Sequence, residues 1–209
     1  MNLIEASHNG MQFCPPVQWS RVAPPCTLSA LLQPIAAKSS KLCPCYPDAS
    51  FDVVLSQFGH MFAPRPDVVT AEMRRVLKPN GRIAFATWPP EHFVGRMFAL
   101  VGRNSPPPPP GAAPPPQWGS PAIITERLGT LFDAPFFERG TMTIPALSIS
   151  HFREFMERSV GPMQKLIERL KGDPQKLSAV RTEFEALAAP YHYENVVHQS
   201  HLLTCAQAQ

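Results

Sequence analysis

The sequence lacks long apolar runs, clusters of basic residues and a secretory leader. None of its apolar runs approaches the roughly 20 residues that a membrane-spanning helix needs. The net charge is only +3 at pH 7, without the Lys/Arg runs that nucleic acid or an anionic membrane favours. The first residues carry Glu5 and no Lys or Arg before a short apolar stretch. We therefore expect a soluble, cytoplasmic protein with no nucleic-acid partner and no membrane span.

Cysteine is too sparse and too irregularly spaced for a disulfide framework. The chain has 5 cysteines, an odd number, and its length is sufficient to bury a core without covalent links. Cys14, Cys26, Cys43 and Cys45 form one C-x-C and two isolated positions instead of paired knuckles. We expect reduced thiols and no metal site. The alternative hypothesis for these cysteines is a zinc-binding adaptor.

Proline is the abundant exception, with 26 residues concentrated in two places. Residues 1–45 are rich in Pro, Cys and Ser, which interrupt every periodic pattern before two turns are complete. We expect an irregular segment there, either non-homologous or disordered, and a boundary at about residue 46. A second proline-rich segment, 105–117, is expected to be a loop, and a polyproline ligand for a recognition domain is its alternative.

From residue 46 onward, turn signals and apolar runs alternate as an α/β domain requires. Residues 51–56 and 82–88 read as short strands buried on both faces, because each is a nearly continuous apolar run. Between them, the apolar positions from Val69 to Leu77 recur at helical spacing after Pro66. A strand, a helix and a strand with short connections predict a parallel crossover.

The remainder of the chain predicts further helices and two strands. A helix is expected at 91–102, another after Ser120-Pro121, and a strand from Phe137 onward. The following helices, at 150–160, 162–171 and 174–189, would form a helical cap over residues 150–190. The segment SHLLTCAQA closes the chain and is expected to be an edge strand.

The predicted crossover places a candidate site at one end of the sheet. In an open α/β sheet, ligands bind beyond the carboxyl ends of the parallel strands. The two trailing loops present aromatic, amide and imidazole groups, which suit an organic ligand better than a metal. These residues are Ser56, Gln57, Phe58, Gly59 and His60 in the first loop, and Trp88, Glu91 and His92 in the second.

The runs FDVVLSQFGHMF and EMRRVLKPNGRIAFATW carry a resemblance to a known family. They resemble the fourth strand, following helix and fifth strand of class I S-adenosylmethionine-dependent methyltransferases, especially the ubiquinone/menaquinone biosynthesis-like type 11 subgroup. LLTCAQA is similar to the last, antiparallel strand of that subgroup. The resemblance implies a partial Rossmann-like sheet, strands four to seven, in a C-terminal part of the domain at 46–209. It also implies S-adenosylmethionine as cofactor and a small organic methyl acceptor.

The resemblance assigns candidate roles to individual residues. Ser56, Gln57 and Phe58 would line the methionine and ribose side of the cofactor, as the corresponding residues do in the family. His60 and His92 are the candidate bases for a methyl-transfer reaction, and for each the alternative is a solvated loop histidine. His192, His198 and His201 are spaced by six and three positions, which suits no common metal site.

The sequence departs from the family before residue 46. Only Gly10 precedes Gly59, so the family's glycine-rich cofactor loop has no counterpart. The acidic residues expected near the ribose and the adenine are also absent. We therefore expect the first third of the domain to be missing or replaced, which would leave strand 51–56 as an exposed edge open to a homo- or hetero-oligomeric partner. The alternative function is an inert remnant or pseudoenzyme that acts as a binding partner.

Overall fold

The computed structural model describes residues 46–209, and it contains the predicted strand, helix and strand. Strand β1, Phe51–Gln57, leads through helix α1, Pro66–Val76, to strand β2, Leu77–Thr87. β1 and β2 are parallel, with Val54 opposite Ile83 and Gln57 opposite Ala86. The parallel crossover is confirmed. The predictions for residues 1–45, including the cysteine-based zinc reading, lie outside the described residues.

The other elements complete a mixed α/β architecture, as predicted. They are α2 Phe93–Arg103, η3 Pro115–Gly119, α3 Pro121–Leu128, β3 Phe136–Pro145, α4 Ile149–Ser159, α5 Gly161–Leu170, α6 Pro174–Ala188, β4 His192–Tyr193 and β5 Val196–Gln207, with short 3-10 turns η2 His60–Phe62, η4 Gly129–Leu131 and η5 Ala189–Tyr191.

The described strands form one sheet in the order β1-β2-β5-β3, with β4 paired to β5. β5 is antiparallel to β2, with Phe85 opposite Thr204, and antiparallel to β3, with Arg139 opposite Leu202. The prediction that SHLLTCAQA forms an edge strand is therefore wrong, whereas its antiparallel direction is confirmed. β5 is long enough to pair along two neighbours, which a sequence pattern of period two does not reveal.

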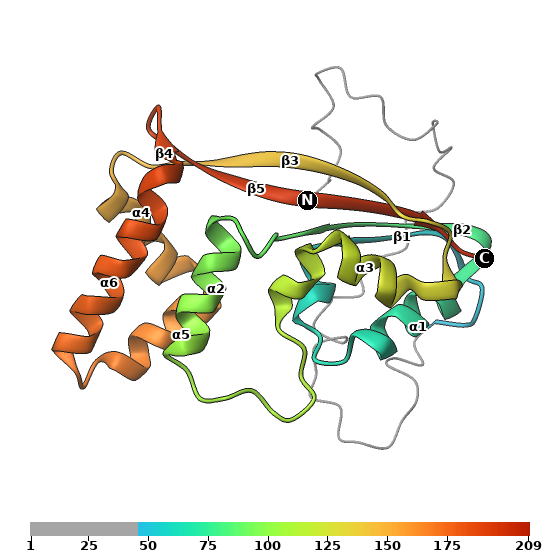
Figure 1. Ribbon diagram of the computed structural model, residues 1–209, viewed down its shortest axis with the longest axis horizontal. Coiled ribbons are helices and arrows are strands. Elements are labelled where there is room, and N and C mark those ends of the chain that lie inside the picture. Colours follow the sequence, from blue (N-terminus) through green and yellow to red (C-terminus); the bar gives the residue numbers. More distant parts are fainter. Residues whose placement is uncertain (1–45) are drawn as a thin grey trace.

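Figure 1 shows the sheet along its edge, with α1 to α6 on one side of it. α1 and α3 lie under one end of the sheet, and α2 with α4, α5 and α6 lies under the other (Figure 1). A cluster of fully buried aromatic rings joins this second group: Phe93 of α2 lies 5.5 Å from Phe152 of α4 and 5.7 Å from Phe184 of α6 between ring centroids. Burial of such rings holds the helices to the sheet.

Three local predictions are corrected by the structure. Strand β2 begins at Leu77 and contains Lys78–Gly81 as an irregularity in its pairing with β1, because Leu77 pairs with Phe51 before the register resumes at Arg82. The proline-rich loop ends in the 3-10 helix η3, since Pro at the first helical positions leaves no unpaired N–H. The helix expected after Ser120-Pro121 ends at Leu128, so Leu131 lies beyond it and is 39% exposed.

Strand β1 pairs only with β2 within the part of the chain that the structure describes. Its Leu55 side chain is 57% exposed, although the strand is composed like one buried on both faces. A parallel strand with one neighbour presents unpaired backbone groups on its other side.

Candidate functional site

The carboxyl ends of β1 and β2 lie side by side, as the crossover requires. Gln57 pairs with Ala86 at the end of the ladder, and the Phe58 backbone N–H continues it by donating to the Ala86 carbonyl at 3.0 Å. The two trailing loops therefore begin at the same end of the sheet. The loop residues predicted to share a crevice start from adjacent positions.

An aromatic stack joins the two loops. The ring of Phe58 lies parallel to the indole of Trp88, with centroids 3.9 Å apart and an interplanar angle of 3°. His201 of β5 presents an edge-on ring to both, with centroids at 6.1 Å from Phe58 and 6.4 Å from Trp88. Phe58 has φ of 59°, in the left-handed region that a bulky side chain seldom adopts. This unusual backbone conformation occurs at the residue whose ring forms the stack.

The Ser56 and His60 side chains form a buried pair at the end of β1. The Ser56 hydroxyl lies 3.0 Å from His60 Nδ1 and accepts a hydrogen bond from the His60 backbone N–H at 3.2 Å. Ser56 is 6% exposed and His60 is 2% exposed. The spacing of four residues lets the pair close the turn between β1 and η2, so the pair fixes the start of the first loop.

His60 lies among apolar rings that disfavour its charged form. Its ring lies 4.4 Å from Phe85 and 4.7 Å from Trp118 between centroids. Burial, and secondarily the positive charge of Arg127, lowers the pKa of His60 to about 3. Its Nε2 is buried and has no hydrogen-bond partner within residues 46–209. His60 is therefore neutral at physiological pH.

Two glycines let the chain pack closely beneath Trp88. A Cβ atom added at Gly119 would lie 2.2 Å from the Trp88 carbonyl oxygen, and one at Gly95 would lie 2.3 Å from the Pro89 carbonyl oxygen. Only residues without a side chain allow η3 and α2 to approach the segment that follows β2 this closely. The position of Trp88 in the stack depends on both contacts.

His92 belongs to a second, more accessible cluster at the start of α2. Arg139 of β3 lies with Nη1 at 2.9 Å from His92 Nε2 and donates from Nη2 to Glu91 Oε1 at 3.0 Å. Partial burial opposes the charge of Glu91, but hydrogen bonds from its own backbone and from Arg139 hold its pKa below the ordinary value. Because a guanidinium only donates, His92 accepts this bond through Nε2 and carries its proton on Nδ1.

The structure thus places the predicted site residues in two settings. Phe58 and Trp88 are in contact, Ser56 and His60 are paired in the interior, and Gln57 is exposed. His92 lies in the separate cluster with Glu91 and Arg139. Sequence reasoning missed His201 and Arg139, which reach this region only because β5 and β3 extend the sheet antiparallel to β2. No local motif signals either residue.

Comparison with known proteins finds a family match for part of this region. Residues 21–85 match the family model described as a methyltransferase domain. The match covers β1, α1 and nearly all of β2, and it starts upstream of the boundary predicted near residue 46. The resemblance to class I methyltransferases is confirmed. The domain boundary itself remains a prediction, because residues 1–45 lie outside the described structure.

Curated relatives can be aligned with most of this chain. An uncharacterized protein of Mycobacterium tuberculosis is 29% identical over 164 residues, which is 78% of this chain and 60% of the relative. The chain thus spans about 60% of the length of this curated relative.

Solved structures show weaker likeness. The YcgJ protein of Bacillus subtilis is 15% identical, with 82% of this chain and 69% of that chain covered and a TM-score of 0.43. A methyltransferase of Thermotoga maritima, described as S-adenosylmethionine-dependent, is 14% identical, with 82% and 62% covered and a TM-score of 0.42. Both TM-scores are below 0.5, so the strand order of the sheet defines the fold here.

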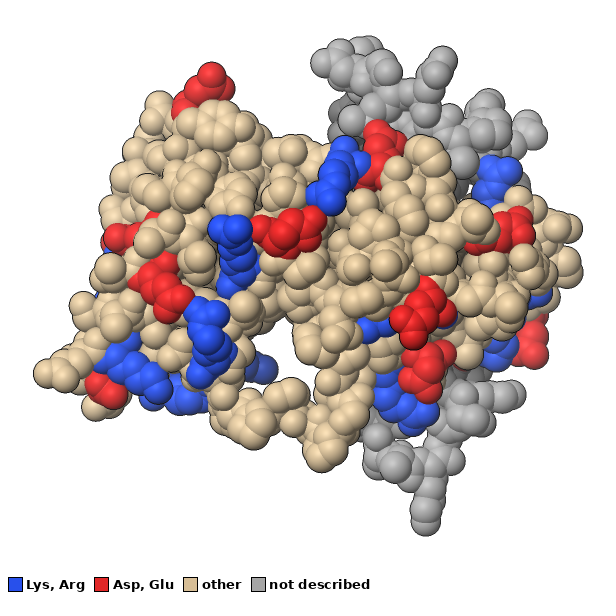
Figure 2. Space-filling view, in the orientation of Figure 1, with Lys and Arg blue, Asp and Glu red and all other residues tan. Residues whose placement is uncertain are grey.

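Figure 2 shows Lys and Arg interspersed with Asp and Glu, without a patch of one sign on this face. Among residues 46–209, no group of three or more His, Cys, Asp or Glu side chains could hold a metal ion. No described helix is both long and apolar enough to cross a membrane.

Proposed function

We propose that this chain takes part in S-adenosylmethionine-dependent methyl transfer to a small organic acceptor at the carboxyl ends of β1 and β2. The observation that carries the proposal is the Phe58–Trp88 stack, which joins the two loops that follow parallel strands. The family match over residues 21–85 supports the reaction class. The chain spans about 60% of the length of a curated relative, so the methyl-transfer activity of the whole protein is also a proposal.

The residues present fit the organic part of the cofactor. The ring of Phe58 is half-buried and is backed on one face by the buried Trp88, and an aromatic ring face suits a purine ring and also a sulfonium cation. Gln57 is exposed beside them and offers both a donor and an acceptor. When bound, S-adenosylmethionine would supply a methyl group that an acceptor atom attacks in line, with the sulfur of S-adenosylhomocysteine as the leaving group. Glu91 also lies near these strand ends, but its carboxylate is already paired with Arg139.

The two candidate histidines receive different roles in this proposal. His60 is 2% exposed and its pKa of about 3 makes it a poor proton acceptor at neutral pH, so we assign it to positioning the first loop through Ser56. His92 lies at the surface of α2, where its side chain is 30% exposed. We assign His92 as the candidate general base, a role that requires Arg139 to leave Nε2, because Nε2 is the unprotonated nitrogen and accepts the hydrogen bond from Arg139. Alignment of the acceptor accounts for most of the rate in such a displacement.

Calorimetric titration of the purified full chain with S-adenosylmethionine tests the proposal. We expect saturable heat with one site per chain, and competition by S-adenosylhomocysteine, which shares the purine and ribose. A folded sample that binds neither compound would overturn the proposal and favour the inert remnant. Circular dichroism and a cooperative thermal transition establish that the sample is folded.

A further inference from the structure

The five prolines Pro106–Pro110, here called the proline strap, have their conformation dictated by their own chemistry. Each ring fixes φ near −65°, and each proline that precedes another is excluded from the helical region. Pro106 to Pro109 satisfy both conditions and therefore adopt a polyproline II helix with about three residues per turn. The segment forms neither helix nor strand in the structure.

The strap is exposed but held firmly at both ends. All five prolines are exposed. At its start, Arg169 of α5 donates to the Asn104 carbonyl at 3.1 Å and to the Ser105 hydroxyl at 2.9 Å. Beyond its end, the Ala113 backbone N–H donates to the Pro64 carbonyl at 3.1 Å. The strap therefore has fixed anchors while its own side chains face solvent.

The strap also stands clear of the body of the protein. In Figure 1 the connection leaving α2 runs apart from the helices, and Figure 2 shows an opening between this connection and the rest of the molecule. Within the described chain, the strap carbonyls accept one backbone hydrogen bond, from Ala112 N–H to the Pro109 carbonyl. The remaining strap carbonyls are available to an external donor.

We propose that the proline strap is a docking site for a protein domain that binds polyproline II helices in a groove lined with aromatic rings. Such grooves, as in SH3 and WW domains, pack rings against proline and donate hydrogen bonds to the free carbonyls. The strap supplies both features in a conformation that is already ordered. Binding therefore costs little conformational entropy, which is the advantage of a preformed polyproline helix.

The test measures binding of the full chain to an array of purified SH3 and WW domains. We expect saturable binding to at least one domain, competed by a synthetic peptide with the sequence of residues 103–114. Replacing all five strap prolines with alanine should weaken that binding by about tenfold or more, since alanine leaves the polyproline conformation unenforced. Circular dichroism and a cooperative thermal transition establish that this variant is folded, because the loss of five prolines raises the entropy of the unfolded chain and lowers the thermal midpoint.

A matched control removes prolines elsewhere on the surface. Pro121→Ala combined with Pro174→Ala changes two exposed prolines at the first positions of α3 and α6, and it should leave domain binding unchanged. Absence of binding to every domain in the array would overturn the proposal. Equal binding by the five-alanine variant would also overturn it, because the contact would then lie outside the strap.

Discussion

Phe58 and Trp88 stack with ring centroids 3.9 Å apart although they follow two different strands. The stack packs the half-buried Phe58 against the buried Trp88 and so joins the two adjacent strand ends. Phe58 adopts a left-handed backbone conformation, whereas Trp88 is held from below by the close approach of Gly119. An uncommon backbone conformation and tight packing therefore occur together at the proposed cofactor site. Such features often accompany function.

Phe58→Ala tests the role of this site. If Phe58 contacts the cofactor, its removal should weaken S-adenosylmethionine binding by about tenfold, the equivalent of roughly 1.4 kcal/mol. Titration calorimetry of parent and variant measures the change. Phe136→Ala is the control, because Phe136 is 62% exposed on β3, and it should bind like the parent. Equal affinities for Phe58→Ala and Phe136→Ala would remove Phe58 from the site.

The buried His60 predicts a dependence of stability on pH. Its folded pKa of about 3 lies below the ordinary value of 6.5, so only the unfolded state takes up a proton between these values. Stability should therefore fall as the pH is lowered from 6.5 towards 3, with an upper bound of roughly 3 to 5 kcal/mol from this group. Urea unfolding of the parent across this range, compared with His60→Leu, isolates the contribution. A parent curve as shallow as that of His60→Leu would refute it.

Two glycines of helix α2 form a matched pair. A Cβ atom at Gly95 would meet Pro89 oxygen at 2.3 Å and Pro90 Cα at 2.5 Å, both backbone atoms, whereas one at Gly102 would meet nothing within 4 Å. Gly95→Ala should destabilise the protein by about 2 to 4 kcal/mol, because backbone must shift. Gly102→Ala should be neutral or stabilising by up to about 1 kcal/mol, because alanine favours helix. Thermal unfolding of both variants tests this prediction, and similar unfolding midpoints for the two variants would contradict the packing argument.

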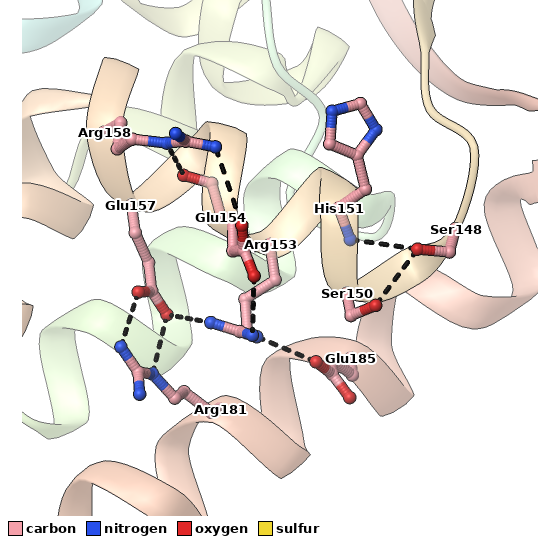
Figure 3. Close-up of polar contacts among 9 residues, drawn as sticks. All are labelled: Ser148, Ser150, His151, Arg153, Glu154, Glu157, Arg158, Arg181 and Glu185. Carbon is pink, nitrogen blue, oxygen red and sulfur yellow. Dashed lines mark hydrogen bonds and ion pairs between the residues drawn. The ribbon is translucent and has the colours of Figure 1, made fainter.

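The ion-pair network between α4 and α6 gives a further prediction. Glu157 accepts hydrogen bonds from Arg153 at 2.9 Å and from Arg181 at 2.8 and 2.9 Å, and Arg153 also reaches Glu185 (Figure 3). Burial opposes the charge of Glu157, but these guanidinium groups hold its pKa below the ordinary value. Glu157→Gln should therefore cost about 1 to 3 kcal/mol of unfolding free energy.

The control for this network is Glu168→Gln, an exposed partner of Lys171 whose side chain is 70% accessible. It should change stability by no more than about 0.5 kcal/mol. The advantage of Glu157 should also disappear as the pH falls below the ordinary glutamate value, because the unfolded state then takes up a proton. A Glu157→Gln variant as stable as Glu168→Gln at neutral pH would contradict the role of the network.

The elements that sequence analysis located are those governed by local pattern. The run from Phe51 to Ser56 was confirmed as a strand, although only Ser56 within it is buried. The helical stripe through Val69 and Met73 was confirmed because burial of one helix face imposes a fixed period. The position of β5 could not be located this way, since pairing with two distant neighbours leaves no local signature. The buried state of His60 was equally hidden, because it depends on Trp118, which lies far along the chain.

The placement of β5 between β2 and β3 determines the order in which the sheet can assemble. β1 and β2 can pair as soon as α1 has formed, whereas β3 has no partner until the whole helical segment from α4 to α6 has been made and β5 has followed it. Nascent β3 must therefore wait with unpaired backbone groups, and such late, long-range pairing slows folding. Chaperone demand should accordingly concentrate on the interval between synthesis of β3 and synthesis of β5.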